Sequence, residues 1–343
     1  MSAADGLDTS PPRPRLPRAA LGALAALAAW EALALVLDGT YLLAGPSAIL
    51  AHAAEHAGLL SRALSETARS AALGYLWGNL AAIALAALAL MLPGAERPIR
   101  LLGLVVFCLP LVATGPILRV LYGPGAGPQI TLSALGVFYT TLVPLLVGLR
   151  VAPQVWLDLV ESYGRGRWAA LVHVRAMAST PYLAAGLQIA APAAFLGAMV
   201  GEFTGAERGM GVLALRAMRS LDVDATWALA TLAAAVSILA YWAAGRACRA
   251  VWPGAPPVLL AAPPADAGDT LRVHLAEGAA VAAAVLLTWW GAMEAFGLNP
   301  FFAKRPGDVW AYMVSAPGAA EHRALLGAAL AQTMATAVPG YLA

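Results

Sequence analysis

Several uninterrupted stretches of roughly 20 apolar residues limit what this chain can fold into more than any other feature. A helix of about 20 residues crosses a bilayer hydrocarbon core of about 30 Å. The 343-residue chain is 61% hydrophobic and 12% charged, whereas a soluble domain has about 25% charged residues. No soluble core would bury so many such stretches, so we expect an all-α polytopic membrane protein.

Eight membrane spans are expected along the chain. Six lie in its first part, at about 18–37, 67–92, 99–122, 129–150, 183–203 and 226–248, and two follow, at about 273–296 and from about 325. Residues 1–17 contain four prolines and no hydrophobic period, which predicts a disordered tail. Five prolines within 253–270 indicate a linker.

An internal repeat relates the C-terminal part to the beginning of the chain. The counterparts at an offset of 260 are Trp30, Tyr41 and Pro46 with Trp290, Phe301 and Pro306, and at an offset of 266 they are Thr67 and Gly74-Tyr75-Leu76 with Thr333 and Gly340-Tyr341-Leu342. The repeat predicts one complete six-span module at 18–252 and the beginning of a second at 271–343. Because the chain ends inside an apolar run at Ala343, we expect that second module to be incomplete.

The repeat and the arginines also bear on topology. Arg13, Arg15 and Arg18 stand ahead of the apolar residues of the stretch 18–37, as in a signal peptide. Its counterpart around Trp290 lies deep inside the chain, which favours a span. With the N-terminus in the cytoplasm, cytoplasmic segments collect 12 of the 21 basic residues. Since six is an even number, the two modules enter the membrane from the same side, as a parallel repeat.

The most unusual cytoplasmic stretch is 151–180, between the fourth and fifth spans. Pro153 suits the first turn of a helix, and Gly164 is suited to end that helix in a left-handed conformation. A second helix then runs up to Pro181, where the chain re-enters the membrane. The pattern predicts a helix–glycine–helix elbow outside the membrane, and a solvated loop with some helical content is the alternative.

This stretch resembles the cytoplasmic loop of binding-protein-dependent ABC transporter permeases. The residues that carry the resemblance are Asp158-Leu-Val-Glu-Ser-Tyr-Gly164, Arg167-Trp168, His173-Val174, Pro181 and Gly186, with Gly201-Glu202 and Gly209-Met-Gly211 further along. Within the superfamily the chain looks most like the nitrate/sulfonate/taurine/bicarbonate branch. It departs from the family at Ala176-Met177, where Leu-Pro is usual.

The resemblance implies that the loop couples transport to a separate ATPase. The residues it assigns to this role are Asp158, Glu161, Gly164, Arg167, Trp168 and His173. The partners would be a cytoplasmic ABC ATPase dimer and a periplasmic or lipid-anchored solute-binding protein, and the location would be the bacterial inner membrane. The chain has no phosphate-binding loop of its own, so ATP would be bound by the partner and no cofactor by this chain. A net charge of +2 gives no indication of nucleic-acid binding.

Polar residues inside spans are the candidates for a translocation pathway, because burial in lipid is costly unless they face a cavity or a partner. We select Asn79, Gln188 and Glu202, and Glu202 is preferred because it adjoins the glycine-rich turn 205–211. Hydrogen bonding between helices or an interfacial position is the alternative for each, as it is for Glu31 and Arg119. Pro110, Pro116, Pro144 and Pro192 are expected to kink spans.

Enzymatic alternatives have little support. His52, Glu55 and His56 fit the H-x-x-E-H pattern of zinc peptidases, but without a convincing third ligand a surface helix is favoured and no metal site is expected. Cys108 and Cys248 suggest neither a disulfide nor a metal cluster.

The resemblance implies a small oxyanion such as nitrate, sulfonate or taurine as the solute. Positive charge near the outer face suits such an anion. This charge comes from Arg119, Arg208, Arg216 and Arg219, for which solvated loop positions are the alternative. Two other functions stay open, namely import of a vitamin precursor of the thiamine-pyrimidine type and a membrane-embedded enzyme.

Overall fold

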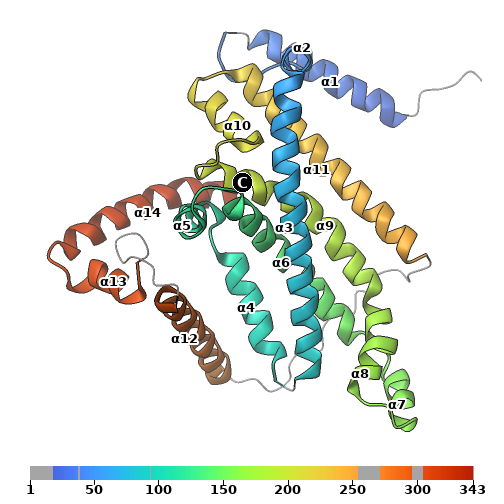
Figure 1. Cartoon of the computed structure of the whole chain (residues 1–343). Helices are drawn as coiled ribbons and strands as arrows, with labels where there is room; N and C mark the ends of the chain where they lie inside the picture. Colours follow the sequence, from blue (N-terminus) through green and yellow to red (C-terminus); the bar gives the residue numbers. More distant parts are fainter. Residues whose placement is uncertain (1–17, 38, 93, 254–270, 296–303, 343) are drawn as a thin grey trace, which may run out of the picture.

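The computed structural model describes residues 18–37, 39–92, 94–253, 271–295 and 304–342, and these residues form helices joined by turns (Figure 1). The expected tail at 1–17 and all but the first residue of the expected linker at 253–270 lie outside the described residues. The helices in chain order are α1 (Arg18–Val36), α2 (Pro46–Glu55), α3 (Ala57–Met91), α4 (Glu96–Cys108), α5 (Leu111–Tyr122), α6 (Gly127–Arg150), α7 (Gln154–Ser162), α8 (Arg167–Ala170), the π-helical turn η1 (Leu171–Arg175), α9 (Ala176–Phe203), α10 (Met210–Arg219), α11 (Val223–Val251), α12 (Leu271–Ala295), α13 (Pro306–Trp310), the π-helical turn η2 (Ala311–Ser315) and α14 (Ala319–Leu342).

Five of the described helical segments are long and apolar enough to cross a membrane. They are α3, α6, the continuous segment Trp168–Phe203, α11 and α14, and the bent pair α4–α5 brings the number to six if it counts as one span. The expected all-helical, multi-span fold is thereby confirmed. Eight spans were expected, and two of them, 18–37 and 273–296, contain only shorter apolar helices, Leu21–Val36 and Gly278–Gly291. Two other expected spans differ in shape from the prediction.

The third expected span, 99–122, is wrong as a continuous helix. The chain bends by 94° between α4 and α5. Leu109 takes an extended backbone conformation, because the residue before a proline is disfavoured in a helix and Pro110 has no N–H to donate. Pro110 was expected to kink the span and instead breaks it.

The fifth expected span, 183–203, is too short, and no break occurs at Pro181. The helix runs without interruption from Arg167 through η1 to Phe203, with Pro181 and Pro192 inside it. Pro181 cannot donate to the carbonyl of Met177, one turn earlier. The Thr180 hydroxyl donates to that carbonyl instead, at 2.8 Å, which is how prolines are tolerated in membrane helices.

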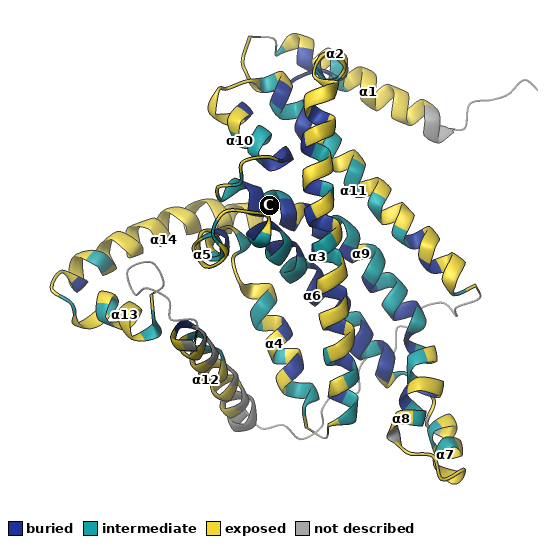
Figure 2. Cartoon of the chain, in the orientation of Figure 1, coloured by how far each residue is buried: buried dark blue, intermediate teal, exposed yellow. Residues whose placement is uncertain are grey.

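Helix α6 occupies the centre of the bundle, between α3 and α9, and α11 packs on the outer side of α9 (Figures 1 and 2). The α6 residues Leu132, Val137 and Leu142 are fully buried. Close approach depends on glycine. A Cβ atom on Gly197 of α9 would lie 2.8 Å from the carbonyl oxygen of Leu132 and from the Cα of Ser133. Small residues at such contacts hold membrane helices together, because they let the backbones approach.

We expect Gly197→Val to destabilise the bundle by about 2 kcal/mol, within the range for overpacked cores. The clash is with α6 backbone, which cannot move aside as a flexible side chain can. The thermal unfolding midpoint of the purified protein should fall. Gly22→Val in α1 is the matched control, since a Cβ there meets nothing within 4 Å. Equal midpoints for the two variants would contradict the proposed packing.

The C-terminal helices do not reproduce this bundle. Helix α12 contacts α4, and α14 packs mainly on η2, with Ala319 as its one buried residue. Figure 2 shows α14 exposed along its length. Within the described residues 271–295 and 304–342, no second module is evident.

Candidate functional site

The expected elbow between the fourth and fifth spans is present. Helix α7 ends at Ser162, and Gly164 follows with φ +68°. The N–H of Gly164 donates to the carbonyl of Glu161 at 2.8 Å, and that of Arg165 donates to Val160 at 3.2 Å. This pair of hydrogen bonds is the Schellman motif, in which a glycine takes the left-handed position. The glycine therefore sets the direction in which α8 leaves α7.

The elbow projects beyond the ends of the long helices, and its side chains are largely exposed (Figures 1 and 2). The elbow exposes the expected charged residues Asp158 and Glu161. It also exposes apolar side chains, namely Val155, Trp156, Leu159, Tyr163 and Trp168. Of the other expected residues, His173 is exposed and its Nδ1 lies 3.0 Å from the carbonyl oxygen of Ala169. Arg167 begins α8, and its side chain lies outside the described part. An exposed surface that combines apolar and charged side chains is typical of a site that binds another protein.

The base of the elbow is built into the bundle. Leu171 and Val174 in the π-helical turn are buried, and Leu171 packs in one apolar cluster with Leu149 of α6. An ion pair between Glu96 and Arg150 joins the beginning of α4 to the end of α6 at the same level. The base of the elbow is therefore continuous with the span Trp168–Phe203 and packed against α6.

Asn79, the first pathway candidate, joins two helices. Its Nδ2 donates to the carbonyl of Tyr75 at 2.8 Å, and its Oδ1 accepts from the Thr141 hydroxyl at 2.5 Å. Both polar ends of the buried amide are thus satisfied between α3 and α6. Asn79 thus makes the hydrogen bonds between helices that were the alternative to a pathway role.

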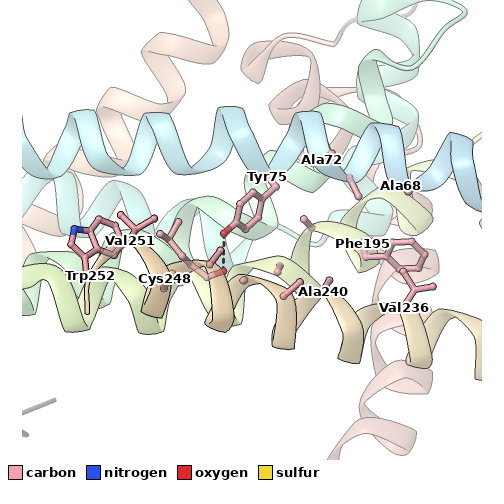
Figure 3. A pocket seen from close by; sticks show the side chains of 16 residues that line it. Ala68, Ala72, Tyr75, Phe195, Val236, Ala240, Cys248, Val251 and Trp252 are labelled. Atoms are coloured by element: carbon pink, nitrogen blue, oxygen red, sulfur yellow. Dashed lines mark hydrogen bonds between the residues drawn. The ribbon is translucent and has the colours of Figure 1, made fainter. Parts of the chain in front are cut away.

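Gln188, the second candidate, lies between α9 and α11. A Cβ atom on Gly245 of α11 would come within 2.6 Å of its side-chain nitrogen. Beside it, α3, α9 and α11 line an open apolar cavity of about 560 Å³, walled mostly by alanines (Figure 3). The Tyr75 hydroxyl crosses this cavity and donates to the carbonyl of Leu187 at 3.0 Å. An apolar wall offers nothing to a polar solute, so the cavity is a poor pathway.

Glu202, the third candidate, closes a hydrogen-bonded clasp at the opposite end of the bundle from the elbow. Its Oε1 accepts from the Thr67 hydroxyl at 2.7 Å and its Oε2 from the N–H of Gly211 at 2.6 Å. The Thr67 oxygen accepts in turn from the N–H of Met210 at 2.8 Å. A Cβ at Gly209 would lie 2.2 Å from the carboxyl carbon, and this residue has φ +132°. The clasp ties α3, α9 and the beginning of α10 together.

The three pathway candidates therefore contact different neighbours, and the structure does not gather them into one site. Helix α10 and the role of Thr67 were not expected from the sequence. A signal for Thr67 existed, since it is one of the non-alanine, non-leucine positions matched in the internal repeat.

The H-x-x-E-H motif lies at the end of α2. His52 and Glu55 belong to α2, and His56 follows that helix, with its ring stacked on His52 at 4.3 Å between centroids. No group of three His, Cys, Asp or Glu side chains suited to a metal ion occurs in the part of the chain that the structure describes.

Glu31 accepts hydrogen bonds from the backbone N–H and the hydroxyl of Ser47, which joins α1 to α2.

Comparison with known families identifies the class of protein that contains this elbow. The family described as binding-protein-dependent transport system inner membrane component matches residues 78–251, just over half of the chain. The chain belongs to this family. The match contains the elbow, α6, α9 and α11, and makes the chain a permease, a transport subunit rather than an enzyme.

Three relatives support the assignment. The permease is 30% identical over 206 residues to a probable ABC transporter permease protein of Haemophilus influenzae, covering 59% of this chain and 82% of the relative. It is 32% identical over 126 residues to the riboflavin transport system permease protein RibX of Chloroflexus aurantiacus, covering 36% and 47%. It is 26% identical over 217 residues to the formylaminopyrimidine transport permease protein ThiX of Halalkalibacterium halodurans, covering 62% and 85%.

Family membership fixes the setting of the permease. It is a multi-pass inner-membrane protein of an ABC importer, and the family carries no cofactor. Binding-protein-dependent transport implies two partners, an ATPase and a solute-binding protein.

Proposed function

We propose that this permease serves an importer of a small heterocyclic vitamin or vitamin precursor. The observation that carries the proposal is the similarity to two relatives, a riboflavin transport permease and a formylaminopyrimidine transport permease. This solute class is the alternative that the sequence left open beside the oxyanions. A nitrate, sulfonate or taurine importer is the second candidate, supported by the arginines toward the outer end, Arg119, Arg208, Arg216 and Arg219.

The elbow is proposed as the contact with the ATPase. Three observations support this role, namely its projection from the bundle, its exposed apolar side chains and its buried base at Leu171 and Val174. The contact residues in this proposal are Asp158, Glu161, Gly164, Arg167, Trp168 and His173. Closure of the ATPase would move α9 through this rigid base and switch access to the pathway.

This role places α7 and α8 in the cytoplasm, and α2 and α10 on the outer side. A cytoplasmic N-terminus is favoured by the distribution of basic residues alone, since α1 lies beside α2 at the α10 end of the bundle (Figure 1). Asn79, Gln188 and Glu202 remain candidates for the pathway, and Glu202 is the best placed because it lies at the outer end.

Residues 271–343 are proposed to open a second, parallel module. Besides the sequence counterparts, the order of elements supports this relation, since α12, α13 and α14 follow one another as α1, α2 and α3 do. Pro46 begins α2, and its counterpart Pro306 begins α13.

The solute class is tested by uptake into proteoliposomes that contain the permease with its ATPase and binding protein. We expect ATP-dependent accumulation of riboflavin or formylaminopyrimidine, and none of nitrate or taurine. A non-hydrolysable ATP analogue gives the background. Accumulation of nitrate or taurine alone would replace the first candidate by the second.

A further inference from the structure

A second cavity, of about 430 Å³, lies at the end of the bundle that carries α10. It opens between α3, the turn that joins α5 to α6, and the turn that joins α9 to α10. Ser70, Gln129 and Glu202 line it and are buried, with exposed fractions of 7%, 5% and 3%. Polar side chains from three different spans thus converge on one buried floor.

The floor is held in place by its own hydrogen bonds. The Gln129 side-chain nitrogen, in the orientation that satisfies the amide, donates to the carbonyls of Gly125 and Ala126 at 3.1 Å each. Glu202 is fixed by the clasp to Thr67 and Gly211. These groups are therefore preorganised, so a ligand would bind to them without first ordering them.

Ser70 differs from the other serines near this end of α3. Ser61 and Ser65 are exposed and donate to carbonyls of α3, at 3.2 Å and 2.7 Å. Ser70 is buried as a residue and lies on the wall of the cavity. A serine hydroxyl has one hydrogen to donate and two lone pairs that accept, so Ser70 adds both capacities to the polar lining.

The charges around the cavity limit what it would hold. Exposed Glu66 and Glu207 stand at the rim with Arg208, and half-buried Arg119 donates to the carbonyl of Gly125 at 3.3 Å. With Glu202, three carboxyl groups face two guanidinium groups. This balance does not concentrate anions, and carboxyl oxygens accept hydrogen bonds from N–H and O–H donors.

We propose that this outer cavity, defined by Ser70, Gln129 and Glu202, is the first binding site for the solute on the permease. It takes a neutral or zwitterionic solute rich in N–H or O–H donors and excludes a simple oxyanion. The inference rests on the proposed function, because it treats the cavity as part of the import route. It deepens that function by placing the discrimination between the two solute classes in this chain.

The test uses solute protection of an introduced thiol in the complete transporter. Cys108 and Cys248 are replaced by serine and alanine, Ser70→Cys is introduced, and a membrane-impermeant maleimide is applied from outside. At riboflavin or formylaminopyrimidine concentrations of twice Kd, labelling should slow about threefold. Nitrate and taurine should leave it unchanged. Ser61→Cys, on the exposed side of α3, is the control that no solute should protect.

The outcomes separate the two proposals. Protection by nitrate or taurine alone overturns the assigned solute class. Heterocycle uptake without protection of Ser70→Cys overturns the cavity as a binding site and leaves the proposed function standing. Absence of both uptake and protection overturns both. If Ser70→Cys does not assemble, Glu66→Cys at the exposed rim gives the same measurement.

Discussion

Replacing Gly164 with valine should lower ATP-driven uptake roughly tenfold, because a strain of about 1–2 kcal/mol shifts a conformational equilibrium five- to thirtyfold. The residue has φ +68°, which L residues adopt at a cost of about 1–2 kcal/mol. A Cβ there meets no atom within 4 Å, so the effect comes from the backbone and not from a clash. A valine would weaken the Schellman motif and redirect α8 relative to α7.

Gly166→Val is the matched control for this prediction. It lies two residues away in the same exposed elbow, also has nothing within 4 Å of its Cβ, and does not have a positive φ. ATP hydrolysis by the assembled complex should continue in both variants, and uptake should fall only in the first. Normal uptake together with normal ATPase association in Gly164→Val would remove the elbow from the coupling role.

The elbow was predictable because its signals are local. Pro153 and Gly164 act on the backbone of their own segment, so the sequence alone places a helix, a left-handed residue and a second helix in order. The approximate positions of the five long apolar helices follow from hydropathy for the same reason, although eight spans were expected. Each apolar stretch must satisfy its backbone hydrogen bonds within itself.

The features that sequence reasoning missed depend on neighbours. Pro110 and Pro181 look alike in sequence, yet one breaks a helix and the other does not, and at Pro181 the Thr180 hydroxyl takes over the free carbonyl. The partners Asn79 and Thr141 lie 62 positions apart, and Thr67 and Glu202 lie 135 apart. Hydropathy contains no term for such pairs, which appear only when the helices pack.

Glu202→Ala is the other substitution from which we expect a large effect, a loss of about 3 kcal/mol of stability. Each buried donor that loses its acceptor costs about 1–3 kcal/mol. The variant removes the acceptor of both Thr67 and the Gly211 N–H. It also empties the space against which Gly209 is packed. Thermal unfolding of the purified complex should show a lower midpoint, and α10 should become accessible to protease.

Two further variants separate the clasp from a general effect of charge. Glu207→Ala removes a carboxylate five residues along the chain in the same turn, where it is exposed, and should leave the unfolding midpoint unchanged. Glu202→Gln keeps the shape and one acceptor, so the Gly211 N–H stays satisfied and the loss should be smaller than with alanine. An unfolding midpoint that rises from alanine to glutamine to wild type is expected only if hydrogen bonding at this position holds α3, α9 and α10 together. If alanine at 202 proves as harmless as alanine at 207, the clasp contributes nothing to the fold, and the outer cavity loses the fixed floor on which its selectivity depends.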